Sequence, residues 1–126
     1  MKKVFGAVLV LAMLAIVLGC DARQKAQEQA RGMRSSNDVK MIVLDLHNQF
    51  DQTKKWPETV DLSGKTNPLT GDTPGYEYVA PTEFNESGYP VDTENTVVIY
   101  QLRNGQRDTS LPVGYANGSV RLLGSE

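Results

Sequence analysis

The stretch SSNDVKMIVLDLHNQFDQTKKWP, residues 35–57, decides the fold of this chain. Its large apolar residues recur at spacings of three and four, which is the period of one face of an α-helix. These residues are Val39, Ile42, Val43, Leu46 and Phe50. Pro57 ends the pattern, because the residue before a proline disfavours the helical conformation. The spacing predicts an amphipathic helix over about residues 37–54, whose apolar face must pack against another element.

The C-terminal half of the chain contains four short runs of aromatic and β-branched residues, which are typical of β-strands. The runs are Tyr76–Ala80, Thr96–Arg103, Leu111–Ala116 and Ser119–Leu123. Asn-Gly at 104–105 marks a turn. Asn117 and Gly118 predict a type I′ hairpin, because both residue types tolerate positive φ. We expect an α+β domain in which one long N-terminal helix packs on a small antiparallel sheet of three to four strands.

The region before the helix changes character twice. Residues 21–34 are polar, rich in good helix formers and nearly without an apolar face, which predicts a solvated helical stalk or a flexible tether. Before them, Lys2 and Lys3 precede Val4–Gly19, a run without charge or proline. As a helix this run would span roughly 24 Å, short of the ~30 Å hydrocarbon core of a bilayer. Residues 1–19 are therefore interpreted as a signal peptide.

Cys20 directly follows the signal peptide, and the stretch Val17–Cys20, VLGC, resembles the bacterial lipobox. The resemblance implies that Cys20 carries a thioether-linked diacylglycerol, that the chain is cut before it, and that its new amine is acylated. Cys20 is the one cysteine of the chain and has no internal disulfide partner, which agrees with lipidation. Asp21 resembles the signal that keeps some bacterial lipoproteins in the inner membrane. The alternatives are a buried free cysteine and an uncleaved helix that ends at Cys20.

These interpretations divide the chain into a signal peptide (1–19), a lipidated anchor with a stalk or tether (20–34), and an α+β domain (35–126). They predict a lipoprotein of the cell envelope that is held at the membrane through Cys20 and faces the periplasm. Removal of the signal peptide leaves 15 acidic residues against 11 basic ones. Aromatic residues are few and not interleaved with basic ones, so we expect no nucleic-acid partner.

The order of these segments is similar to that of type IV pilins and the pseudopilins of type II secretion. NPLTGDTPGYEYVAP at 67–81 resembles the loop-to-strand segment of major pseudopilins, and the segment 96–124 resembles the prepilin-type H-x9-DG domain. Arg107 and Asn117 depart from that pattern, since the family places histidine and aspartate there. Leu11 stands where a prepilin would carry its glutamate, which argues against assembly into a fibre. The resemblance implies a structural or interaction subunit that contacts envelope or secretion-system proteins.

The residues that could take part in catalysis do not form a catalytic pattern, so we do not expect an enzyme. His47, the one histidine, is expected at the edge of the core with a hydrogen-bonded ring. Because major pseudopilins bind calcium in this region, the resemblance makes Asp72, Asp92 and Glu94 calcium candidates, with Asn67 a weaker one. A solvated loop is the alternative interpretation, and a small ligand- or calcium-binding lipoprotein is the alternative function.

Overall fold

The computed structural model describes the backbone of residues 2–124 and the side chains of residues 22–124. It contains one helix, α1 (Lys2–Thr53), followed by strands β1 (Tyr76–Tyr78), β2 (Val97–Arg103), β3 (Gln106–Arg107), β4 (Val113–Tyr115) and β5 (Val120–Arg121). The chain forms two compact units, residues 1–31 and 32–126. The first unit is helical, with exposed side chains from Ala22 to Arg31. The second contains the core and all five strands.

Helix α1 is longer than the amphipathic segment predicted over 37–54. It includes the polar residues 21–34, which are therefore helical, because they contain no proline and consist mostly of strong helix formers. The helix ends at Thr53, since Lys54 adopts the left-handed conformation with φ 60°. The N–H of Lys54 donates to the carbonyl of Phe50 at 2.7 Å, which closes the last turn.

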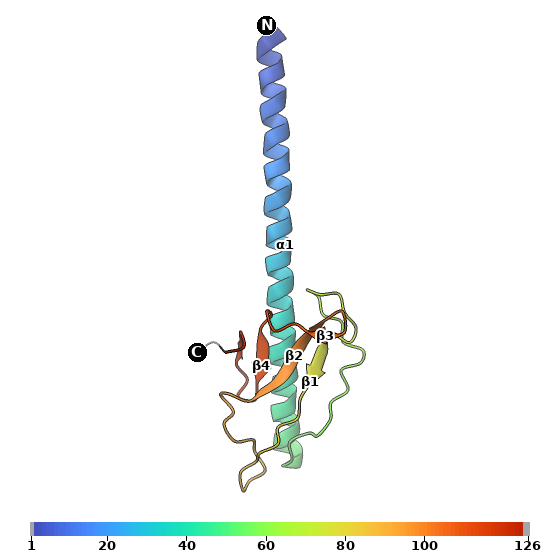
Figure 1. The fold of residues 1–126 in the computed structure, drawn as a ribbon, viewed down its shortest axis with the longest axis vertical. Coiled ribbons are helices and arrows are strands. Elements are labelled where there is room, and N and C mark those ends of the chain that lie inside the picture. Colours follow the sequence, from blue (N-terminus) through green and yellow to red (C-terminus); the bar gives the residue numbers. More distant parts are fainter. Residues whose placement is uncertain (1, 125–126) are drawn as a thin grey trace. The chain divides into compact units, whose positions relative to one another are not determined.

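The strands form one antiparallel sheet with the order β1-β2-β4-β5, and β3 pairs with β2 beyond this path (Figure 1). Strand β2 is therefore central and pairs with three others. Four of the five strands lie within the runs that the sequence predicted, and β3 is the addition. The fold is α+β with a pilin-like architecture: a long N-terminal helix packed on an antiparallel sheet.

The prediction of a type I′ turn at Asn117–Gly118 is wrong. That geometry occurs at Asn104–Gly105, where φ is 54° and 77° and the turn joins β2 to β3. Gly118 has φ 94° but Asn117 does not have positive φ, and the N–H of Gly118 donates to the carbonyl of Tyr115 at 2.9 Å. The connection is thus a three-residue loop. The extra residue is Ala116, which is fully buried and donates its N–H to the carbonyl of Thr96 at 2.8 Å.

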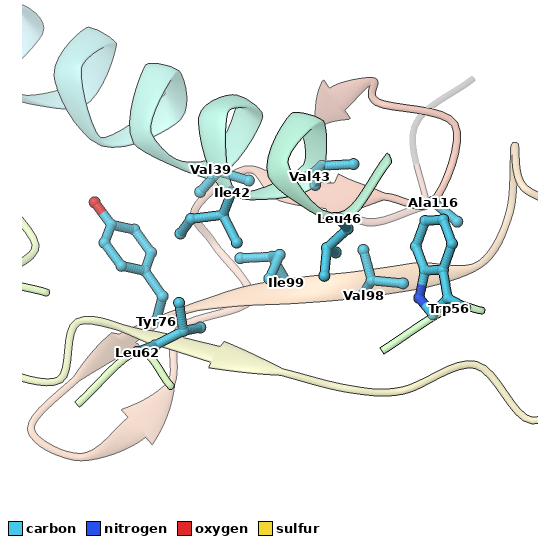
Figure 2. Close-up of a cluster of buried hydrophobic side chains, with 10 residues drawn as sticks. All are labelled: Val39, Ile42, Val43, Leu46, Trp56, Leu62, Tyr76, Val98, Ile99 and Ala116. Atoms are coloured by element: carbon cyan, nitrogen blue, oxygen red, sulfur yellow. The ribbon is translucent and has the colours of Figure 1, made fainter. Parts of the chain in front are cut away.

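The core lies between residues 39–46 of α1 and one face of the sheet, as the apolar stripe predicted (Figure 2). Val39, Val43 and Leu46 are fully buried, whereas Phe50 at the end of the stripe is only partly buried. An irregularity in the pairing of β2 with β4 lies between Val97 and Ile99, and successive residues Val98 and Ile99 both join the core. This end of β2 therefore contributes more apolar surface than a regular strand would.

Gly114 on β4 allows the helix to approach the sheet closely. A Cβ atom at this position would lie 2.7 Å from Cγ1 of Val39 and 3.0 Å from Cγ2 of Val43. Real Cβ atoms do not come this close to other carbons, so any other residue would push the helix away from the sheet.

Candidate functional site

Cys20 lies within the helical backbone of α1, but its side chain is outside the described residues, so its lipidation stays a prediction. Among the residues whose side chains are described, no helical segment is both long and apolar enough to cross a membrane.

The calcium candidates lie at different ends of the sheet. Asp72 accepts a hydrogen bond from the N–H of Gly105, just beyond the C-terminal end of β2, at 2.9 Å. Asp92 and Glu94 precede the N-terminal end of β2, and this seven-residue strand is roughly 20 Å long. Within the described part of the chain, no three histidine, cysteine or acidic side chains come together as a metal site. The three candidates therefore do not converge on one cation.

Asn67, the weaker calcium candidate, is fully buried and belongs to an amide cluster instead. Its Nδ2 group donates to the carbonyl of Gly75 at 3.2 Å and to Oε1 of Gln101 at 3.0 Å. Its Oδ1 atom accepts from the N–H groups of Leu69 and Thr70. All four hydrogen-bonding positions of this amide are thus occupied by protein groups, which leaves none for a metal ion.

Gln101 extends this amide cluster across the sheet, because its Nε2 group donates to the carbonyl of Pro112 at 3.0 Å. Gly75 is part of the same arrangement, since a Cβ there would lie 2.4 Å from the backbone nitrogen of Asn67. The segment 67–81 therefore ties a loop to the sheet. Sequence reasoning missed this role of Asn67 and Gln101, although the Asn-Pro pair and the following glycine were its visible signal.

Arg107 and Asn117, the two departures from the family pattern, do not meet. Arg107 forms an ion pair with Glu77, with Nε at 3.1 Å from the carboxylate, and its guanidinium lies 4.2 Å from the ring centre of Tyr100. The hydrogen bond to Glu77 raises the pKa of Arg107. Asn117 caps its own loop by accepting from the N–H and hydroxyl of Ser119. Each residue has a structural role at a different end of β2.

His47 sits at the edge of the core with both ring nitrogens hydrogen-bonded, as the sequence predicted. Nε2 lies 2.7 Å from the carbonyl of Ala116, which can only accept, so Nε2 carries the proton. In a neutral ring, which carries a single N–H, Nδ1 then accepts from the hydroxyl of Tyr89 at 3.1 Å. Trp56 packs edge-on against His47 and Tyr89, with ring centres 5.4 and 5.7 Å apart. This aromatic cluster joins the C-terminal end of α1 to the loop that contains Tyr89.

Two tyrosines of β1 fix the strand to the helix and to the loop after it. The hydroxyl of Tyr76 donates to Oδ2 of Asp38 on α1 at 2.9 Å, and that of Tyr78 donates to the carbonyl of Pro57. Burial and the neighbouring Asp38 carboxylate raise the pKa of Tyr76 well above its usual value. Burial raises the pKa of Tyr78 to about 12. Both phenols therefore stay protonated at neutral pH.

An open groove of about 380 Å³ lies at the outer edge of β1, and it is the candidate binding site of the domain. The segment 58–63 forms one wall, and Pro74 with β1 forms the other. Hydrogen bonds hold the chain on both sides of this segment. Before it, the carbonyl of Pro57 accepts from the hydroxyl of Tyr78. After it, the carbonyl of Lys65 accepts from the N–H of Gly75 at 2.8 Å. The groove is therefore part of the fixed structure.

A second exposed surface lies on α1, opposite the core. Met33, Met41 and Leu44 are 74%, 60% and 44% exposed. At 100° per residue they fall within about one quarter of the helix circumference, on the side away from Val39, Val43 and Leu46. We call these three residues the outer stripe.

Comparison with protein-family models, with curated proteins and with solved structures finds no match to this chain.

Proposed function

We propose that this chain is a non-enzymatic lipoprotein of the bacterial cell envelope, tethered to the membrane through Cys20. Its pilin-like domain would act as a structural or interaction subunit linked to a type II secretion or pilus-like assembly. The short apolar run before VLGC supports the tether. The pilin-like architecture and the structural roles found for the pseudopilin-like segment support the second part.

The observation that carries the interaction role is the outer stripe. A helix that packs one face on its own domain normally presents polar residues on the other. Here two methionines and a leucine are exposed on that face beside the polar residues Asn37 and Asn48, and Met41 and Leu44 are neighbours at a spacing of three. Methionine adapts to irregular partner surfaces. We infer that the outer stripe receives a helix of a neighbouring subunit, in the manner of an amphipathic helix packing along its apolar face.

Mass spectrometry of the membrane fraction tests the tether. We expect Cys20 to begin the processed chain and to carry a diacylglycerol thioether and an acylated amine. Replacing Cys20 with alanine should leave a full-length precursor. An unmodified Cys20 in the processed protein would contradict the proposal.

Site-specific photo-crosslinking tests the interaction role in the native envelope. A photoreactive side chain at Met41 or Leu44 should yield an adduct with an envelope protein, mapped by mass spectrometry to a helix of that protein. The matched control is the same group at Glu86, an exposed position in the loop after β1. Equal yields at Leu44 and Glu86, or no adduct at the stripe, would rule out the outer stripe as the docking surface.

A further inference from the structure

The outer edge of β1 is open to a further strand. In the pairing of β1 with β2, the N–H of Leu102 donates to the carbonyl of Gly75, and the N–H of Val79 donates to the carbonyl of Val98. Each of these hydrogen bonds is 2.8 Å long. Alternation along an antiparallel pair then directs the backbone groups of Tyr76 and Tyr78 away from β2, toward the groove. Within the described residues, β1 pairs with no strand other than β2. Tyr76 is 3% exposed and Tyr78 is only partly buried, so the open part of this edge lies at Tyr78.

The groove is also negatively charged. Glu58, Asp61 and Glu77 line it, and none of its lining residues is a lysine or arginine. Glu77 is already paired with Arg107, whereas Glu58 and Asp61 are exposed and form no ion pair among the described residues. Hydrogen bonds from the hydroxyl and N–H of Ser63 lower the pKa of Asp61, so it stays ionised.

We propose that this groove binds an extended, basic segment of a partner protein, which pairs with the outer edge of β1 as an added strand. Main-chain hydrogen bonds to Tyr78 would hold the segment, as in other cases of strand addition to an open sheet edge. Lysine or arginine side chains at alternate positions would face Glu58 and Asp61, because side chains repeat with period two along a strand. This surface is separate from the outer stripe and from the Cys20 tether, so its test stands independently of theirs.

Calorimetric titration of the full chain in detergent micelles with synthetic peptides tests the proposal. The probe is a six-residue peptide of alternating lysine and valine, and its charge control alternates glutamate and valine. Two further peptides keep the basic sequence but are N-methylated, one at the odd and the other at the even residues, so that each lacks the backbone donors of one edge. We expect the basic peptide to bind, the acidic one not to bind, and N-methylation on the pairing edge to weaken binding at least tenfold. The amide signal of Tyr78 should shift in the NMR spectrum on binding.

Variants of the groove provide the second arm. The double change Glu58→Gln and Asp61→Asn removes both unpaired charges from exposed positions. We expect it to lower the affinity for the basic peptide about fivefold to tenfold. The matched control, Glu83→Gln with Glu86→Gln, removes the same charge from the exposed loop after β1 and should leave binding unchanged. The proposal is overturned if the basic peptide fails to bind, if neither N-methylated peptide binds more weakly than the unmodified one, or if both double variants weaken binding equally.

Discussion

At the residue scale, single atoms set the distance between the helix and the sheet. Gly114 is present because no Cβ fits between β4 and the side chains of Val39 and Val43. The same holds at Gly75, where the backbone of Asn67 occupies the place of a side chain. Neither glycine has positive φ, so both are required by close approach and not by an unusual backbone conformation.

Replacing Gly114 with alanine should therefore destabilise the domain by about 1–3 kcal/mol, the usual cost of overpacking a core. Urea unfolding followed by circular dichroism measures this. Gly64→Ala is the matched control, because a Cβ there has no atom within 4 Å. Adding Val39→Ala to Gly114→Ala should restore part of the loss. Strictly additive effects of the two changes would show that the predicted contact does not exist.

The two buried phenols make stability depend on pH in the alkaline range. The pKa of Tyr78 is about 12 in the folded chain against 10 in an ordinary tyrosine, and that of Tyr76 is also raised. Between pH 10 and 12 the unfolded chain releases these protons while the folded chain retains them, so stability is full below pH 10 and falls above it. Unfolding free energies measured from pH 8 to 12 should decline less steeply in the double variant Tyr76→Phe, Tyr78→Phe. An identical slope would disprove the assignment.

At the scale of elements, α1 has two apolar faces with different roles. Leu46 is fully buried against the sheet, and Leu44 on the outer stripe is 44% exposed. The two residues have the same chemistry and lie on the same helix two positions apart, so they form a matched pair.

Leu46→Ala should cost about 2–5 kcal/mol of unfolding free energy, because it creates a cavity in the core. Leu44→Ala should change stability by no more than about 0.5 kcal/mol. Thermal unfolding of the purified chain compares the two directly. A large loss from Leu44→Ala would mean that the outer stripe already packs on something within the chain itself.

The amide cluster gives a prediction for the loop between α1 and β1. Asn67→Ala leaves Oε1 of Gln101 without its Asn67 donor and the N–H groups of Leu69 and Thr70 without their Oδ1 acceptor, whereas the carbonyl of Gly75 keeps the N–H of Leu102. Each buried group left unpaired costs about 1–3 kcal/mol. We expect faster amide hydrogen exchange over residues 65–75 together with lower stability. Asn95→Ala, at an exposed asparagine that bonds only Asp92, is the control and should change neither. Unaltered exchange in the Asn67 variant would contradict the role of the cluster.

Local patterns were sufficient for the elements but not for the contacts between them. The spacing of Val39, Ile42, Val43 and Leu46 predicted both the helix and its packing face, because helical period and burial follow from the same residues. The turn at 117–118 was misjudged because Ala116 is held by a long-range bond to Thr96, which no local pattern records. The calcium candidates followed from their acidic type and from the resemblance to major pseudopilins, whereas β2 separates them in the structure. The groove depends on where segment 58–63 runs, which is a tertiary property.

At the scale of the whole molecule, the core is confined to the second unit. Every residue of the core cluster lies between Val39 and Val120, and none lies in residues 22–31, whose side chains are all exposed. The signal peptide and tether predicted from the sequence thus coincide closely with the unit that contributes no described core residue.

A fragment of residues 32–126 should therefore fold with the melting temperature of the full chain, as measured by differential scanning calorimetry. A fragment of residues 40–126 is the control. It lacks Val39 and the Asp38 partner of Tyr76, so it should melt at a clearly lower temperature. A lowered melting temperature for the 32–126 fragment would show that the first unit stabilises the second.

The aromatic cluster at the end of α1 also gives the molecule an intrinsic optical reporter. Trp56 is the one tryptophan of the chain, is 6% exposed, and stands at 90° to the ring of Tyr89. Its fluorescence emission should be blue-shifted in the folded domain and should receive excitation energy from Tyr89. Because Trp56 follows α1 and Tyr89 belongs to the loop before β2, the transfer is lost when that loop separates from the helix end. Labelling is therefore unnecessary for following the contact between Trp56 and Tyr89 in real time.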